Sequence, residues 1–198
     1  MKELETVCDR QQQTLYRLEM LRAIAEHLNR ISDLQPMLDT ALGLILDLMG
    51  LHTGWIALLD EEGCFYCAAA QGLPLALEAE DRAALRWSPC QCQRMFLAGE
   101  LTQAVNIVEC ERLGRVRQAL QGQEPELAHR KLGGLRYQAS IPLQAGNRVM
   151  GMMNVARAGK EPLGEQELTL LSLVGETLGA AIHRAQLYEG AKQVARLR

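Results

Sequence analysis

Cysteine is the residue type best able to do chemistry in this 198-residue sequence, and five of the six cysteines lie between positions 64 and 110. Cys90 and Cys92 follow Ser88-Pro89, which is typical of a helix start because serine caps the N-terminus and proline fits the first turn. Free N–H groups and the positive end of the helix dipole favour a thiolate there. A lowered pKa makes a cysteine reactive or metal-binding. We expect Cys90 and Cys92 to form a thiol site that Cys110 approaches from the following strand, or else all three to be small buried side chains.

Cys64 and Cys67 have the spacing of a metal chelate, but only if they lie on a loop. On a strand, residues three apart point to opposite faces and lie about 10 Å apart along the chain. Only one of the two can then face a pocket. Cys67 shares its parity with Phe65 and Ala69 and is the better candidate, with core packing as its alternative role.

The cofactor stays open at this stage. Four thiolates, from Cys67, Cys90, Cys92 and Cys110, could hold an iron–sulfur cluster, because such clusters need little besides thiolates. Their spacing matches no standard cluster motif, and the four histidines are isolated from one another, which disfavours haem. The aromatic side chains that could line a pocket for a planar ligand, or else pack in the core, are Trp55, Phe65 and Phe96.

Composition excludes several classes of function. Lysine and arginine number 21 against 24 aspartates and glutamates, a net charge of −3, and no basic run could follow a phosphate backbone. Nucleic acid is therefore not an expected partner. No apolar run approaches the roughly 20 residues that cross a bilayer, and the polar N-terminus is unlike a signal peptide. We expect a cytoplasmic chain with reduced thiols, built as one domain with helical extensions.

Helices are expected at both ends of the chain. Residues 4–31 carry an apolar stripe at alternating gaps of three and four residues, and a second helix follows Asp33 and ends at Met49-Gly50. From Gly164 onward the same alternation continues almost to the last residue. The stripe of the first helix comprises Leu18, Leu21, Ala25, Leu28 and Ile31; that of the last comprises Leu171, Val174, Leu178, Ala181, Ala185, Tyr188, Lys192 and Ala195. Helices this long need a partner for an apolar seam, which predicts a parallel homodimer.

Strands are expected in the middle of the chain. Residues 53–60 and 64–70 form one predicted hairpin, and residues 137–143 and 149–155 form a second. Residues 101–108 have strand-like composition, and the polar segment 111–131 is expected to be helical in part.

The order of these elements resembles that of a GAF domain over residues 34–185. The stretch Trp55 to Asp60 is similar to that family's first strand, Cys67 to Pro74 to its second strand ending in Gly-Leu-Pro, and Ser140 to Leu143 with Val149 to Val155 to its closing hairpin. The resemblance implies an α+β fold with a central antiparallel sheet (GAF/PAS-like), helices on one face and a ligand pocket on the other. Residues 1–33 and 186–198 would then be signalling helices outside the domain.

A narrower resemblance concerns function. The helix start at Cys90 and Cys92 and the later Cys110-Glu111-Arg112-Leu113 resemble the GAF modules of bacterial sensor histidine kinases, including nitrate- and oxygen-responsive ones. The resemblance implies a sensory domain that binds a small ligand or senses redox state through its cysteines. The dimeric flanking helices would pass the signal to a histidine kinase or another effector. Kinase motifs are absent, so we do not expect this chain itself to be an enzyme.

Two alternatives remain. Some GAF proteins reduce free methionine sulfoxide with a cysteine shortly before the penultimate strand, but Lys131 to Gly134 fills that region here. A purely structural dimerisation module is the other alternative. Bilin attachment is disfavoured because no cysteine is followed by histidine.

Overall fold

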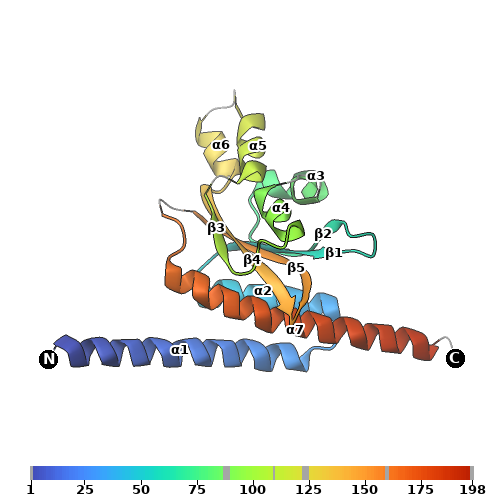
Figure 1. The fold of residues 1–198 in the computed structure, drawn as a ribbon. Coiled ribbons are helices and arrows are strands. Elements are labelled where there is room, and N and C mark those ends of the chain that lie inside the picture. The colour runs from blue at the N-terminus through green and yellow to red at the C-terminus, as the bar shows by residue number, and fades with distance from the viewer. Residues whose placement is uncertain (1, 87–89, 109, 122–124, 159–160, 197–198) are drawn as a thin grey trace.

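The computed structural model describes residues 2–86, 90–108, 110–121, 125–158 and 161–196 (Figure 1). These residues form seven helices and five strands. The helices are α1 (Lys2–Arg30), α2 (Leu34–Met49), α3 (Leu75–Arg86), α4 (Gln91–Leu97), α5 (Glu111–Ala119), α6 (Pro125–Lys131) and α7 (Glu165–Arg196); the strands are β1 (Thr53–Leu59), β2 (Phe65–Gln71), β3 (Val105–Ile107), β4 (Leu135–Ala145) and β5 (Arg148–Ala158).

The strands form one antiparallel sheet in the order β2-β1-β5-β4-β3. The two predicted hairpins, β1–β2 and β4–β5, are present, and together they supply the four longest strands. Their pairing places Trp55 beside Asn154 and Asn154 beside Ser140, so these three side chains lie on one face of the sheet. The predicted α+β fold with a central antiparallel sheet is confirmed.

Helices lie on both sides of this sheet (Figure 1). We call the side covered by α2 and α7 the α7 face, and the side covered by α3, α4 and α5 the α4 face. Along β1 the alternation is strict, because Ile56 and Leu58 pack on the α7 face whereas Trp55 and Ala57 pack on the α4 face. Strands β1, β2, β4 and β5 therefore each contribute to two separate apolar clusters, whereas the apolar residues of β3 join the cluster on the α4 face.

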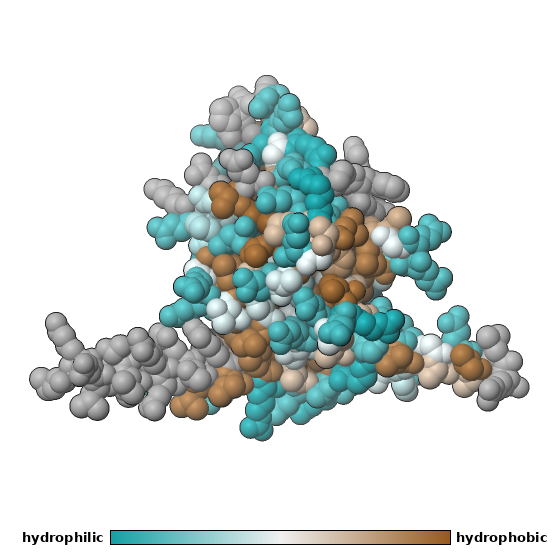
Figure 2. All heavy atoms as spheres, viewed as in Figure 1, coloured by the Kyte–Doolittle hydropathy of each residue, from teal (hydrophilic) through white to brown (hydrophobic). Residues whose placement is uncertain are grey.

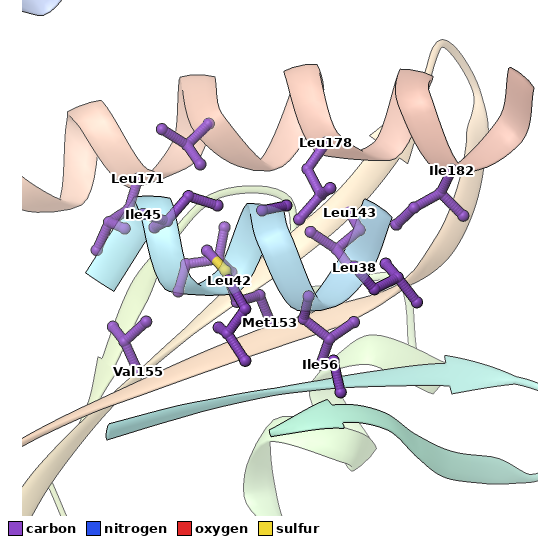
Figure 3. Packing of buried hydrophobic residues seen from close by; sticks show 14 of the residues in the cluster. Leu38, Leu42, Ile45, Ile56, Leu143, Met153, Val155, Leu171, Leu178 and Ile182 are labelled. Atoms are coloured by element: carbon purple, nitrogen blue, oxygen red, sulfur yellow. The ribbon is translucent and has the colours of Figure 1, made fainter. Parts of the chain in front are cut away.

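The cluster on the α7 face is the main core (Figure 3). Leu38, Leu42 and Ile45 of α2 meet Leu171 and Leu178 of α7 above the sheet strands, and all five are 1% exposed or less. Burying a leucine or isoleucine side chain contributes about 1.5–3 kcal/mol. This cluster is therefore the chief source of stability.

Helix α7 crosses β4 with backbone nearly touching backbone. A Cβ atom added at Gly175 would lie 2.5 Å from the carbonyl oxygen of Pro142, and one at Gly179 would lie 2.3 Å from the backbone nitrogen and oxygen of Gln144. No other residue type fits at these distances. Glycines one turn apart therefore set the separation between helix and strand.

The helix boundaries follow local sequence signals. Gly50 adopts φ 61° at the end of α2, the left-handed conformation expected of a helix C-cap. Helix α3 was not predicted, although it begins directly after Pro74 and buries Leu77 and Leu85. The strand expected over residues 101–108 covers only Val105–Ile107.

The apolar stripe of the last helix has a different role from the one predicted. Val174, Leu178, Ala181 and Ala185 are buried against the sheet and α2 of the same chain, so they cannot form a dimer seam. In α1, Leu28 is likewise buried in the main core, whereas Leu18 is 58% exposed. The large apolar residues of α1 and α7 that remain exposed are Leu15, Leu18, Leu173, Leu187, Tyr188 and Val194.

None of the described helices combines the length and apolar character that crossing a membrane requires.

Candidate functional site

The two thiols expected to do chemistry are in contact on the α4 face. Helix α4 begins at Gln91 with Cys90 as its extended N-cap residue and Cys92 in its first turn, and both side chains are buried. Their Sγ atoms lie 2.7 Å apart. Cys90 therefore precedes the helix, where the prediction had placed it in the first turn. The predicted helix start at Ser88-Pro89 lies outside the described residues.

The two thiols have different acidities. The hydrogen bond from Cys92, together with the positive charge of Arg112 and backbone N–H groups, lowers the pKa of Cys90 to about 6 despite its burial. The same hydrogen bond, with burial, raises the pKa of Cys92. At neutral pH, Cys90 is consequently the thiolate of the pair and Cys92 the proton donor.

Arg112 of α5 brings a buried positive charge to this pair. Its side chain is 2% exposed, its Nη2 donates to Cys90 Sγ at 3.5 Å, and its guanidinium carbon lies 5.7 Å from the centre of the Trp55 ring. No carboxylate forms an ion pair with Arg112 within the described parts of the chain. On the surface, Arg94 of α4 and Glu111 of α5 form a two-bond ion pair that ties the two helices together.

Three buried polar side chains line the sheet beneath these helices. Gln138 Nε2 donates to Asn154 Oδ1 at 2.8 Å and to Ser140 Oγ at 3.2 Å, and Ser140 Oγ donates to Asn154 Oδ1 at 2.7 Å. Gln138 Nε2 also lies 3.9 Å from Cys92 Sγ. The strands thus connect directly to the thiol pair.

The contacts described above form a closed ring of side chains. Following them in turn leads from Asn154 to Gln138, then to Cys92, Cys90 and Arg112, then to Trp55, which is the strand neighbour of Asn154. All six side chains are 2% exposed or less. We call this set the buried polar ring: Trp55, Cys90, Cys92, Arg112, Gln138 and Asn154.

The remaining candidate residues lie in the same apolar cluster as the ring. Cys110 is the buried N-cap residue of α5, and burial raises its pKa. Phe65 and Phe96 meet edge to face with ring centres 5.0 Å apart. Cys67 is partly buried on β2, where its thiol donates to the carbonyl oxygen of Ala69 at 3.5 Å. Cys64 is exposed.

The parity predicted for Cys67 is half right. Cys67 and Phe65 share the α4 face, but Ala69 packs on the α7 face. The reason is a β-bulge, because Ile56 pairs with Ala69 and Ala57 pairs with Cys67, which leaves Ala68 as an extra residue. A bulge reverses the alternation beyond it.

The four-thiolate metal site remains a prediction. Within the described ranges, no three residues among histidine, cysteine, aspartate and glutamate are grouped so that they could hold a metal ion. Of the cysteines named for such a site, only Cys90 and Cys92 make direct contact.

Sequence reasoning missed the polar half of the ring. Arg112 was noticed only as part of Cys110-Glu111-Arg112-Leu113, and the amides Gln138 and Asn154 were not named as site residues. A usable signal was present, because Gln138, Ser140 and Asn154 interrupt otherwise apolar strands at positions that face inward. Buried polar residues are informative where exposed apolar ones are not.

Comparison with known proteins decides the family. The sequence profile of the GAF domain matches residues 32–183. The chain belongs to the GAF family. The chain is also 36% identical over 174 residues to the sensor histidine kinase YhcY of Bacillus subtilis (strain 168). That match covers 87% of this chain and 44% of the relative, so the chain spans less than half of the kinase's length.

Solved structures agree on the fold. The GAF domain of a phosphoenolpyruvate-protein phosphotransferase from Coxiella burnetii matches with a TM-score of 0.63 at 18% identity, covering 89% of this chain and 98% of that one. The free methionine-R-sulfoxide reductase of Neisseria meningitidis matches with a TM-score of 0.59 at 15% identity, covering 89% and 93%. At these identities the likeness concerns the fold alone.

Proposed function

We propose that this GAF domain is the sensory module of a signalling protein, in which a small ligand or a change in redox state acts on the α4 face and α7 passes the signal to a histidine kinase. One observation carries the proposal. Strand β4 bears Gln138 of the buried polar ring and, a few residues later, the backbone that contacts Gly175 and Gly179 of α7. A shift at the ring therefore has a direct route to the helix.

The related kinase supports the choice of effector. YhcY is a sensor histidine kinase, and it matches this chain over 174 residues, which is 87% of the chain. In this chain α7 continues as a helix past the sheet, with exposed side chains from Leu187 to Ala195 (Figure 1). Such a projecting helix is suited to output.

The redox form of the proposal uses Cys90 and Cys92. A low-molecular-weight disulfide attacked by the Cys90 thiolate releases one thiol and leaves a mixed disulfide. Cys92 then displaces the second thiol and gives up its proton, so that two protein thiols become one disulfide. The low pKa of Cys90 and the contact between the sulfur atoms support this order of attack. Metal binding by these thiols is the alternative to the redox form of the proposal.

We also propose that a second copy of this chain pairs through α1 and α7. Figure 2 shows hydrophobic side chains emerging on α1 and on the last part of α7, away from the body of the domain. Leu15 is 60% exposed and Leu187 is 61% exposed. Exposed leucines on neighbouring parallel helices are typical of a coiled-coil interface.

The redox test measures both the thiols and the helix. In a Cys8→Ser, Cys64→Ser background, which removes the exposed thiol of Cys64, we expect one equivalent of fast-reacting thiol near neutral pH, lost in Cys90→Ser and retained in Cys110→Ser. Oxidation with glutathione disulfide should change amide hydrogen exchange in α7, and Cys92→Ser should abolish that change. Iron and sulfide analysis of protein purified without oxygen tests metal binding by the thiols. The visible absorption spectrum of the same protein tests haem and bilin binding. Unreactive thiols, no bound cofactor and an unchanged α7 would contradict the proposal.

The dimer is tested separately by sedimentation at micromolar concentration. Leu187→Glu should yield monomer, whereas Leu97→Glu, which changes an equally exposed leucine on α4, should leave the dimer intact. A monomeric wild-type chain would contradict the dimer.

A further inference from the structure

Three polar atoms of the buried polar ring have no hydrogen-bond partner among the residues that the structure describes. They are Arg112 Nε, Gln138 Oε1 and Asn154 Nδ2, on side chains that are 2%, 1% and 0% exposed. Buried polar atoms in folded proteins are nearly always hydrogen-bonded, because an unmatched one loses its interaction with water without replacement. Three unmatched atoms on one ring of contacts point to a binding function.

The charge of the ring defines the first requirement on a ligand. Arg112 is buried and cationic, and its contact with Cys90 uses Nη2, whereas Nε is the unmatched atom. A guanidinium presents Nε–H and a neighbouring N–H as a planar fork that matches the two oxygens of a carboxylate. The Trp55 ring beside the guanidinium helps to hold that plane.

The amides define the second requirement. Asn154 Nδ2 is a donor and can serve the same oxygens as Arg112, whereas Gln138 Oε1 is an acceptor and needs a donor from the ligand. An acceptor group alone would leave Gln138 unmatched. The ligand must therefore combine an anionic oxygen pair with a hydroxyl group.

We propose that the buried polar ring binds a small hydroxycarboxylate, with its carboxylate on Arg112 and Asn154 and its hydroxyl donating to Gln138. This proposal rests on the proposed sensory function and names the chemical class of the signal. The competing view is that the Cys90 thiolate alone balances Arg112. That view leaves all three unmatched atoms without a role.

The test uses three probes of similar size: glycolate, acetate and acetamide. Calorimetric titration of the wild-type chain at constant pH and ionic strength should rank glycolate above acetate, with no binding of acetamide. Arg112→Met should weaken glycolate binding about 10-fold or more, the loss expected for a charge-assisted hydrogen bond. Arg112→Lys should recover part of the affinity. Arg115→Met, which changes an exposed arginine of the same helix, should bind glycolate like wild type.

A second measurement needs no change at the ring. In a Trp87→Phe background Trp55 is the only tryptophan, since the sequence has two. Its fluorescence should respond saturably to glycolate and not to acetamide, even if Arg112→Met does not fold. No saturable response to glycolate or acetate up to about 10 mM, tenfold above the Kd of a ~4 kcal/mol site, would overturn the proposal. An equal response of wild type and folded Arg112→Met would also overturn it.

Failure of this inference differs from failure of the proposed function. Reactive thiols and a responsive α7 without any binding of glycolate or acetate would overturn the hydroxycarboxylate and leave the sensor. Saturable, Arg112-dependent glycolate binding would establish the ligand class even if neither ligand nor oxidation altered α7, in which case the output role would fall.

Discussion

The α7 face of the sheet is lined by apolar side chains, whereas the α4 face buries an arginine, two amides, a serine and three cysteines among its apolar residues. The same strands build both faces, because alternate residues point to opposite sides. Burying polar groups costs free energy unless each finds a partner, and on the α4 face three atoms find none in the described parts of the chain. The α7 face therefore supplies apolar packing against α2 and α7, whereas the α4 face holds the polar atoms on which the proposed recognition rests.

The largest effect should come from the core of the α7 face. Leu178→Ala removes a side chain that is 0% exposed, and we expect a loss of about 3 kcal/mol in the free energy of unfolding from lost burial and the cavity that remains. Leu173→Ala, at a leucine of the same helix that is 40% exposed, is the matched control and should cost under ~1 kcal/mol. Urea unfolding measures both. Equal losses would mean that the helix does not use this face for stability.

Next in size is the close contact between α7 and β4. Gly179→Ala would place a Cβ atom 2.3 Å from the backbone of Gln144, which forces the helix away from the strand and should cost about 2 kcal/mol. Gly190→Ala in the same helix meets nothing within 4 Å and should stabilise by up to ~1 kcal/mol through helix propensity. If Gly179→Ala were also stabilising, the helix would not be held against the strand.

Much of the difference between the two faces of the sheet could be predicted from the sequence. It follows from the alternation of apolar and polar residues along the strands and from helix-capping signals, both of which are local. The hairpins, the Gly50 cap and the long terminal helices are examples. What could not be predicted depends on packing between distant segments. The contact between Arg112 and Trp55 joins α5 to β1, and the bulge at Ala68 is visible only in the strand pairing. The burial of Leu178 within its own chain likewise depends on how α7 lies on the sheet.

The third prediction concerns pH and the α4 face. The pKa of Cys90 is lowered from 9.0 to about 6 in the folded chain, so the unfolded chain binds the extra proton between these values. Wild-type stability should therefore gain over that of Cys90→Ser by ~1–2 kcal/mol as pH rises from 6 to about 7.5. The gain should disappear as pH falls through 6.

The control for this pH dependence is Cys110→Ser. Burial raises the pKa of Cys110 above 9.0, so that thiol stays protonated in both the folded and the unfolded chain below about pH 8, and there its variant should differ from wild type by a constant amount. Urea unfolding at several pH values measures both differences. A constant difference for Cys90→Ser would mean that Cys90 is not the thiolate of the pair.

The smallest effect should come from the polar strand residues. Ser140→Ala removes one of two hydrogen bonds to Asn154 Oδ1 and leaves the bond from Gln138, so we expect a loss of about 1 kcal/mol. Thermal unfolding, with Leu178→Ala alongside, gives the comparison. A loss as large as that of Leu178→Ala would assign the polar residues to stability and weaken the distinction between the faces.

The two long helices give the chain a straight path past the domain. The N-terminus of α1 and the C-terminus of α7 lie at opposite ends of the helical layer, and the sheet stands to one side of it (Figure 1). A helix turns by about 100° for each residue, so deleting one residue beyond Leu187 would swing whatever follows through that angle. Deleting seven residues would return the segment that follows almost to its original orientation. Residue count along the tail would thus set the resting orientation of the output module proposed above.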